Sequence, residues 1–410
     1  MRCFVPDVLT DQLPLFPFRS PDNDPFVPVT ADDAHALQAA VSRVRLPTGG
    51  WTWLVTRHAD VRQLLRSDAF SADAYRSGFP LLRAAPPNTA NKGGFIRMDG
   101  EQHQRLRRML TAEFMIKNIR RIEPLITGIV GEALDDLAEA GPPADLITGF
   151  ALPVPSLVIC HLLGVPYADH AFFQSRSRDL LDRGATQQRT LAAITDLRGY
   201  LHHLITTERE AGARGDNLLS RLITERVDTG ELDVDELVGM ALLLLVAGHE
   251  TTANMIGLST LLLLRHPQHL SALRAEPELA DTMVEELLRY LSIVRSGLPR
   301  VAIRDTEIGG QAIRAGEGAI GLLSLANRDD ASFTGDPDAF DPYREARQHL
   351  AFGFGVHQCI GQPLARAELR VALIALAQRF PRLRLAEDTT QPPTRDMSFV
   401  YGLAELRVAW

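Results

Sequence analysis

The stretch from Leu237 to Pro267, LVGMALLLLVAGHETTANMIGLSTLLLLRHP, constrains the fold more than any other part of the chain. It follows the capping pattern TGELDVDE and runs for roughly 30 residues, which corresponds to a helix about 45 Å long. Because nearly every face is apolar except at the centre, this helix is predicted to cross the whole molecule inside the core. His249 and Glu250 interrupt the apolar run too early for a membrane span.

The centre of this helix carries polar and flexible residues, namely Gly248, Glu250, Thr251 and Thr252. A buried polar group without a partner costs about 1–3 kcal/mol, so a core helix rarely has several without a reason. We therefore expect a functional site here. The alternative is a hydrogen-bonded buried cluster with a kink at the glycine.

Helical periodicity dominates the rest of the chain from about Ala31 onward. β-rich runs occur at 51–56 and 300–322, where they alternate with glycine-containing turns. The predicted fold is therefore mainly α with a smaller β region. No repeat, charge block or linker divides the sequence, which favours one domain over residues 1–410. Further helices are expected at 124–141, 189–212 and 277–292.

Composition and cysteine usage exclude some classes of protein. The chain is 45% hydrophobic and 23% charged, which suffices for a substantial core, and its net charge of −8 gives no general attraction for nucleic acid. Cys3, Cys160 and Cys359 show no paired spacing, so we expect free thiols in a reducing compartment. The N-terminus resembles neither a signal peptide nor a membrane span, which predicts a cytoplasmic protein.

Several common catalytic motifs are absent. His249-Glu250 could begin a zinc-protease motif, but the second histidine that this motif needs four residues later is Ala253. No G-x-S-x-G elbow, Walker loop or dinucleotide-binding glycine pattern occurs. His357 and Cys359 lack a second Cys/His pair of zinc spacing, so a cofactor with a single protein ligand fits them better.

Cys359 lies in the segment FGFGVHQCIG, directly before a long helical pattern. Pro363 falls in the first helical turn, so the cysteine lies near the positive end of the helix dipole, where a thiolate is favoured. Gly353, Gly355 and Gly361 allow close backbone approach and unusual φ values, so the loop can cradle a flat group. For a lone cysteine, a buried neutral thiol would be the simpler interpretation.

The complete pattern, Phe352-Gly353-x-Gly355-x-His357-x-Cys359-x-Gly361, resembles the heme-thiolate signature of the cytochromes P450. The resemblance covers most of the chain, because MDGEQHQRLRRML, AGHETT and EELLR occur in the family's order. It implies the P450 fold, a heme b cofactor and Cys359 as the axial ligand of the iron. The heme contacts implied are His103, Arg107, Ala247, Gly248, Arg300, Phe352, Gly353, His357, Cys359 and Gly361.

Individual roles follow from the same resemblance. His103, Arg107, Arg300 and His357 would bind the heme propionates. Taken alone, His103 and Arg107 would suit an exposed helix face, and Arg300 would suit a solvated strand. Glu286 and Arg289 would form a structural ion-pair network with a downstream arginine such as Arg344; in isolation they would be an ordinary helix ion pair worth a few tenths of a kcal/mol.

The resemblance also implies the reaction. Such an enzyme is a monooxygenase that inserts one atom of O2 into a substrate and needs two electrons and two protons to cleave the O–O bond. Thr251 would hold bound oxygen and an ordered water by hydrogen bonds, and Glu250 would belong to a proton relay from solvent.

Electrons must come from another protein, because the chain contains no flavin or iron–sulfur region. The stretch HQRLRRMLTAEFMIKNIRR carries six Lys/Arg against one Glu and is predicted to be a helix that docks an acidic ferredoxin, itself reduced by an NAD(P)H-fed reductase. Arg105 and Arg108 are the residues whose reversal should slow reduction. A solvated amphipathic face is the alternative.

The substrate is expected to be a sizeable apolar molecule, such as a secondary metabolite, terpenoid, steroid or xenobiotic, that is hydroxylated or epoxidised. The implied pocket includes a mobile loop at 75–94 and the region 172–181, and Arg295 would meet a polar group of the substrate or face solvent. Its other lining residues would be Leu244, Ala247, Gly248, Ile293, Val294, Val400 and Tyr401.

Two other functions remain open. A peroxide-using heme-thiolate enzyme would typically replace the acid–alcohol pair, which Glu250 and Thr251 supply here. A non-catalytic P450-like activator or binding protein would be favoured by loss of the cysteine, which is present.

Overall fold

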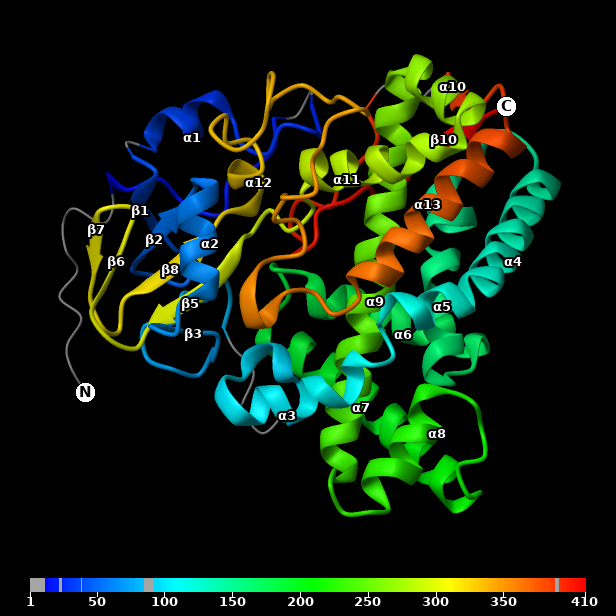
Figure 1. Ribbon diagram of the computed structural model, residues 1–410, viewed down its shortest axis with the longest axis horizontal. Coiled ribbons are helices and arrows are strands. Elements are labelled where there is room, and N and C mark those ends of the chain that lie inside the picture. Colours follow the sequence, from blue (N-terminus) through cyan, green and yellow to red (C-terminus); the bar gives the residue numbers. More distant parts are fainter. Residues whose placement is uncertain (1–11, 22–23, 38, 85–91, 388–390) are drawn as a thin grey trace.

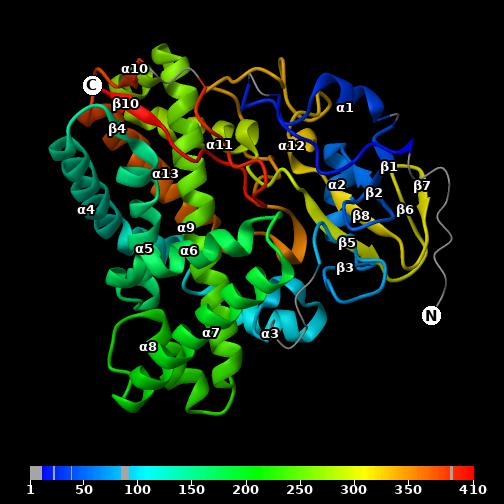
Figure 2. The same ribbon diagram turned by 180° about the vertical axis from the view of Figure 1, so that it is seen from behind.

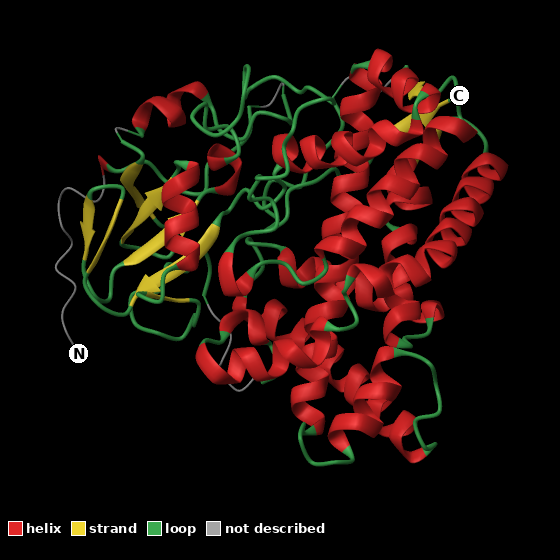
Figure 3. Ribbon diagram, viewed as in Figure 1, coloured by secondary structure: helices red, strands yellow, loops and turns green. Residues whose placement is uncertain are grey.

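The computed structural model describes residues 12–21, 24–37, 39–84, 92–387 and 391–410. A large helical part and a smaller β-rich part lie side by side (Figures 1 and 3). Most strands lie near the N-terminal end, whereas β10 (Arg407–Ala409) lies near the C-terminus (Figure 1). The helices surround the long helix α9 (Val234–Arg265) (Figure 1). The prediction of a mainly α fold with a smaller β region is confirmed.

The helices have the following bounds: α1 Ala31–Ala36, α2 His58–Arg66, α3 Gly100–Thr111, α4 Ile116–Ala140, α5 Pro153–Leu163, α6 His170–Leu181, α7 Gln187–Glu210, α8 Leu218–Leu222, α9 Val234–Arg265, α10 Pro267–Ala275, α11 Ala280–Leu291, α12 Leu323–Ala326 and α13 Gln362–Arg379. The expected helices at 189–212 and 277–292 correspond to α7 and α11. The expected helix at 124–141 begins earlier, at Ile116, and contains Pro124 in its interior.

The strands are short: β1 Val41–Arg45, β2 Trp51–Val55, β3 Phe70–Ser71, β4 Ala144–Asp145, β5 Leu298–Ala302, β6 Thr306–Ile308, β7 Gln311–Ile313, β8 Gly318–Gly321, β9 Arg384–Leu385 and β10 Arg407–Ala409. They form a five-stranded sheet in the order β1-β2-β8-β5-β3, a three-stranded sheet β4-β10-β9 and the hairpin β6-β7. In the large sheet only β2 and β8 pair in parallel, with Trp53 opposite Ala319. Both β-rich runs expected from sequence are therefore strands.

Helix α9 begins as its sequence predicts. The carboxylate of Asp233 accepts a hydrogen bond from the N–H of Glu236, and the Glu236 side chain accepts one from the N–H of Asp233. The helix then continues without a break past Gly248 to Arg265. In the described part of the chain it is the one helix long and apolar enough to span a membrane, but 67% of that apolar window is buried in the protein, as in a core helix.

The helices around α9 cover it from opposite sides. Figure 1 shows α13 in front of α9, and Figure 2 shows α6 and α7 on the other side. Its buried residues join a hydrophobic cluster that includes residues from Phe26 to Val408. The middle of α9 is therefore held between α13, whose first turn follows Cys359, and α6.

The prediction of a single basic helix is wrong. The basic stretch from His103 to Arg121 is divided between α3 and α4, with a turn from Ala112 to Met115. The N–H of Met115 donates to the carbonyl of Ala112, and Asn118 Nδ2 donates to the same carbonyl at 2.7 Å. These local bonds stabilise a corner within an otherwise helical sequence.

Candidate active site

The loop before α13 holds Cys359 in a fixed position. The N–H of Cys359 donates to the carbonyl of Phe352 at 2.8 Å. Gly353 and Gly355 have φ of +69° and +75°, in the left-handed region that favours glycine. A Cβ atom on Gly355 would also lie 2.6 Å from the carbonyl oxygen of Leu65 in α2. The glycines therefore allow the loop to turn tightly against α2.

The electrostatics around Cys359 differ from the expectation. Burial raises the pKa of its thiol, although the N–H groups of Gly361 and Gln362 and the guanidinium groups of Arg107 and Arg366 oppose the rise. The helix end therefore favours the thiolate as predicted, but burial outweighs this effect. Cys359 nevertheless keeps exposed surface within the surrounding protein. A cation bound at the sulfur would supply the positive charge that stabilises the thiolate.

A narrow strip of α9 is left uncovered at its centre. Ala247 is the one exposed residue between Glu236 and Leu264, a part of the chain that the structure describes in full. Leu243 and Thr251, four residues away on either side, are half-buried and lie on the same face. Thr251 Oγ1 donates to the carbonyl of Ala247 at 2.7 Å. Gly248 allows close packing, because a Cβ there would lie 2.8 Å from Ile159 of α5.

Cationic and imidazole side chains gather between α3, β5 and the cysteine loop. The rings of His103 and His357 lie 4.2 Å apart, and Arg107 donates to the carbonyl of Gln358 at 2.5 Å. Burial, then His357 and Arg107, lower the pKa of His103 to about 4. Burial, then Arg97, lower the pKa of Arg300 to about 10. Burial is the largest cause of both pKa shifts and mutual repulsion adds to it, so the cluster would favour an added anion.

Two members of this cluster, Arg97 and Asp99, were not predicted from the sequence. Arg97 repels Arg300, and Asp99 lies 3.5 Å from Nε2 of His357. Burial would raise the pKa of Asp99, but hydrogen bonds from His357, Ser71 and Ala72 hold it well below its usual range. Asp99 precedes α3 and could have been expected to cap it, yet its carboxylate bonds elsewhere. The only sequence signal was the position of both residues directly before the basic helix.

Glu250 points away from solvent at the centre of α9. Its Oε2 lies 3.2 Å from Nη1 of Arg395, which comes from the C-terminal segment. Its neighbour His249 is fully buried, with Nδ1 2.6 Å from the carbonyl of Leu245. Among the described residues, no group of three or more His, Cys, Asp or Glu could hold a metal ion.

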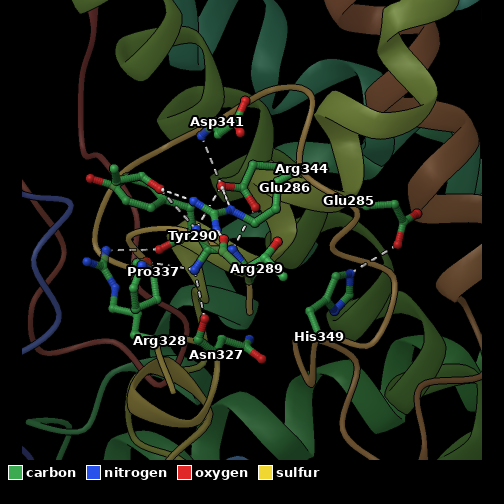
Figure 4. A network of polar contacts seen from close by, with 12 residues as sticks. Glu285, Glu286, Arg289, Tyr290, Asn327, Arg328, Pro337, Asp341, Arg344 and His349 are labelled. Atoms are coloured by element: carbon green, nitrogen blue, oxygen red, sulfur yellow. Dashed lines mark hydrogen bonds and ion pairs between the residues drawn. The ribbon is translucent and has the colours of Figure 1, made fainter. Parts of the chain in front are cut away.

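The ion-pair network of α11 is complete and buried (Figure 4). Arg289 makes a two-pronged contact with Glu286, at 2.6 and 2.7 Å, and donates to the carbonyls of Asn327 and Pro337 at 2.8 Å each. Arg344, the partner expected from sequence, lies 3.1 Å from Glu286. All three side chains are almost wholly inaccessible to solvent.

A second buried contact beside it was not expected. Glu285 receives a bond from Nη2 of Arg366 in α13 at 3.0 Å and lies 3.2 Å from Nε2 of His349. Burial would raise the pKa of Glu285, but His349 and Arg366 lower it to about 2. The pair connects α11 to the helix that follows Cys359.

The residues expected to line a substrate pocket have mixed placements. Leu244, Ile293 and Val400 are buried in the main hydrophobic cluster, and Val294 packs against it. In the loop at 75–94, residues 85–91 lie outside the described residues, as does Cys3. Arg83, in the same loop, donates to the carbonyls of Leu180 and Asp182 at the end of α6.

Both interpretations of Arg295 are wrong. The side chain is buried, donates to the carbonyl of Pro25 at 2.6 Å and to Ser20, and lies 3.6 Å from the ring centroid of Tyr401. It therefore fastens the N-terminal segment rather than facing substrate or solvent. Its guanidinium also occupies one face of Tyr401.

The family model for cytochrome P450 matches residues 167–406. The chain belongs to the cytochrome P450 family. It is 48% identical over 100% of its length to cytochrome P450-SU2 of Streptomyces griseolus, 99% of which is covered. It is 46% identical to the vitamin D3 dihydroxylase of the same organism, covering 90% of this chain and 90% of that one. The structure of mycinamicin VIII C21 methyl hydroxylase from Micromonospora griseorubida matches with a TM-score of 0.90 at 40% identity, covering 97% of this chain and 100% of that one.

This P450 is therefore a heme-thiolate monooxygenase, and its residues fit the cofactor. Cys359 offers an accessible sulfur, and Ala247 and Thr251 lie on the uncovered strip of α9. Nε2 of His103 is buried, lacks a hydrogen-bond partner in the described part of the chain, and lies within a cluster that includes Arg97, Arg300 and Arg107. Two carboxylates of a heme would satisfy that nitrogen and offset this charge.

Glu368 of α13 gives the P450 a pH-dependent contact with α9. Its carboxyl is buried and bonds Thr252, and burial raises its pKa from 4.5 to about 8 against the opposing effect of that bond. The folded state therefore binds this proton more tightly than the unfolded state. The resulting stability is fully present below about pH 4.5 and is lost as the pH rises through about 8.

Glu368→Gln should remove this dependence, because the amide keeps the shape without ionising. Urea unfolding between pH 5 and 8 should show a flatter stability curve for the variant, with a gain on the order of a few kcal/mol at pH 8, since one pKa unit corresponds to about 1.4 kcal/mol. The exposed Glu405→Gln is the control. Parallel curves for wild type and Glu368→Gln would exclude this role.

Proposed function

We propose that this P450 hydroxylates or epoxidises a sizeable apolar small molecule with electrons from an acidic ferredoxin, as a single-domain cytoplasmic enzyme. The observations that carry the proposal are the exposed Cys359 in the loop before α13 and the uncovered strip of α9 that contains Thr251. The relatives named for hydroxylation of vitamin D3 and mycinamicin VIII support a sizeable substrate. A screen of such compounds for a spin-state change of the heme would identify ligands, and product formation with ferredoxin, reductase and NADPH tests the activity.

Heme bound at Cys359 would supply O2 binding and activation, with the thiolate sulfur donating electron density to the iron. The chain's own contribution is to hold and move protons. The hydroxyl of Thr251 already bonds the Ala247 carbonyl, so it can accept a hydrogen bond on the uncovered strip. Glu250, held by Arg395, stands one residue away within α9. Leu244, Ile293 and Val400 would exclude water from the substrate's side.

Thr251→Ala should uncouple electron use from product formation. The variant is expected to retain heme and consume NADPH, but to release most of its reducing equivalents as hydrogen peroxide because a proton-positioning hydroxyl is lost. Peroxide and product per NADPH are the measurements. Thr260→Ala is the matched control, because Thr260 makes the same bond to the carbonyl four residues back, at Ile256. Equal coupling in Thr251→Ala and wild type would contradict the role.

The surface beside the cysteine loop fits an acidic electron donor. Arg107 of α3 bonds the residue before Cys359, which brings α3 against the loop. Arg108, Lys117, Arg120 and Arg121 of α3 and α4 are exposed, and so are the apolar side chains of Met115, Ile116 and Val356. Arg105 does not belong to this surface, because it is bound to Glu236 and to the carbonyl of Glu231.

Arg108→Glu should slow reduction by ferredoxin, and the effect should shrink as salt is added, because charges at an exposed interface are screened. Stopped-flow reduction at low and high salt measures this. Arg314→Glu makes the same charge change in the turn after β7, away from the cysteine loop (Figure 1). Equal slowing by both variants would show a general effect of charge and exclude docking at α3.

A further inference from the structure

Two buried acceptor atoms face each other at the centre of α9. Nδ1 of His249 lies 2.6 Å from the carbonyl oxygen of Leu245, so this nitrogen carries the ring hydrogen, because a carbonyl can only accept. Nε2 is then a bare acceptor, 3.8 Å from Oε1 of Glu250. Both Nε2 and Oε1 are buried and have no hydrogen-bond partner among the residues that the structure describes. An arrangement of this kind costs roughly 1–3 kcal/mol per unsatisfied atom, and one proton between the two atoms would satisfy both.

The surroundings keep this pair dry and fix it in place. The ring of Phe173 in α6 packs edge-on against His249, with the ring centroids 5.5 Å apart. Arg178, also on α6, adds a repelling positive charge. On the α5 side the contact beside His249 is apolar, between Gly248 and Ile159.

Arg395 ties the other oxygen of Glu250 and reaches towards solvent. It bonds Oε2 at 3.2 Å, and its side chain is 21% exposed, against 3% for Glu250. The hairpin around it is held by a bond from the Arg395 N–H to the Gly402 carbonyl at 2.8 Å. The three side chains therefore form a row from the buried imidazole to the protein surface.

We propose that His249 and Glu250 share one mobile proton and act as a way-station for the protons that the reaction consumes. The proposal rests on the proposed function. His249 is a positioning residue, which acts through Glu250. A proton that enters beside Arg395 binds between Nε2 of His249 and Oε1 of Glu250. When this proton moves on to the uncovered strip of α9 that contains Thr251, both atoms become acceptors again. The positive charge of Arg395 then balances the Glu250 carboxylate. No electrons are exchanged.

The resting protonation state agrees with this cycle. Burial lowers the pKa of His249, against the opposing effects of Glu250 and the Leu245 carbonyl, and Arg178 lowers it further. The imidazole is therefore neutral at rest and available to accept a proton.

Infrared titration of the heme-loaded protein tests the shared proton without any substrate. The carboxyl band of Glu250 is identified by its loss in Glu250→Gln. In His249→Phe the midpoint pH of this band should fall, because the proton must then reside on Glu250 alone beside Arg395. His249→Gln can donate a hydrogen bond to Glu250 but cannot carry a proton, so it should not restore the wild-type midpoint. An unchanged midpoint in His249→Phe, or a restored one in His249→Gln, would overturn the proposal.

Turnover measurements test whether the shared proton serves the reaction. They use a compound that causes a spin-state change of the heme. Both His249 variants should release more hydrogen peroxide per NADPH, with coupling reduced about tenfold, since a positioned acid–base group contributes roughly 10²–10⁴-fold when it acts directly. If the wild type makes no product but the midpoint pH of the carboxyl band falls in His249→Phe as predicted, the proposed function fails while the shared proton stands. Normal coupling in His249→Phe would show that the pair is not a way-station.

Discussion

Glu286→Gln is expected to prevent stable folding of the heme-loaded protein. The substitution removes the charge that Arg289 and Arg344 face in a site without solvent access. Removing one partner of a buried ion pair typically costs about 3–5 kcal/mol, a large part of the roughly 5–15 kcal/mol by which domains are stable. Urea unfolding of the purified variant, or its loss from the soluble fraction, measures the effect.

Loss of the Glu286 charge should also disturb the cysteine loop, because a series of hydrogen bonds connects Arg289 to that loop. Arg289 donates to the carbonyl of Asn327, and the side-chain oxygen of Asn327 accepts the N–H of Leu350 at 2.7 Å. The carbonyl of Leu350 in turn accepts the N–H of Gly353 at 2.8 Å. Any folded Glu286→Gln protein should therefore bind heme weakly.

Glu231→Gln provides the matched control, because Glu231 pairs with Arg226 where both side chains are well exposed. Surface pairs contribute about 0–1 kcal/mol, so this variant should unfold close to the wild type. If Glu286→Gln were as stable as Glu231→Gln, the buried network would have no structural role.

Cys359→Ser is expected to abolish monooxygenase turnover while leaving the fold intact. The serine hydroxyl keeps the size of the side chain, and the backbone bond to Phe352 does not involve it. What would be lost is the sulfur that we propose as the iron ligand, which would donate electron density to the metal. Product formation should fall below detection, whereas the urea midpoint of the heme-free protein should change little.

Cys160→Ala separates this effect from a general need for cysteine. Cys160 is buried in α5, and burial raises the pKa of its thiol to about 12, so it stays neutral. This variant should retain heme and turnover with a modest loss of stability. Turnover in Cys359→Ser, or its loss in Cys160→Ala, would point to a different ligand.

Local patterns were sufficient to predict the parts of the fold that local forces determine. The cap at Asp233, the apolar run of α9 and the strand at Trp51 all follow from residues close in sequence. The Glu286–Arg289 contact lies within one helix turn and was equally predictable.

Contacts between distant residues were not predictable in this way. The direction of Arg295 depends on carbonyls and a hydroxyl about 270 residues earlier in the chain, and Arg105 depends on Glu236. The raised pKa of the Cys359 thiol follows from burial by the whole fold, which no helix pattern reports. The family pattern predicted which residues meet, but not which of them repel one another.

The central claim is that Cys359 binds heme iron as a thiolate. The absorption spectrum of the purified protein, reduced and exposed to carbon monoxide, tests it most directly. The predicted result is a main band far to the red of that of a histidine-ligated heme, which disappears in Cys359→Ser. A band at the position of histidine-ligated heme, or protein that takes up no heme at all, would contradict the claim.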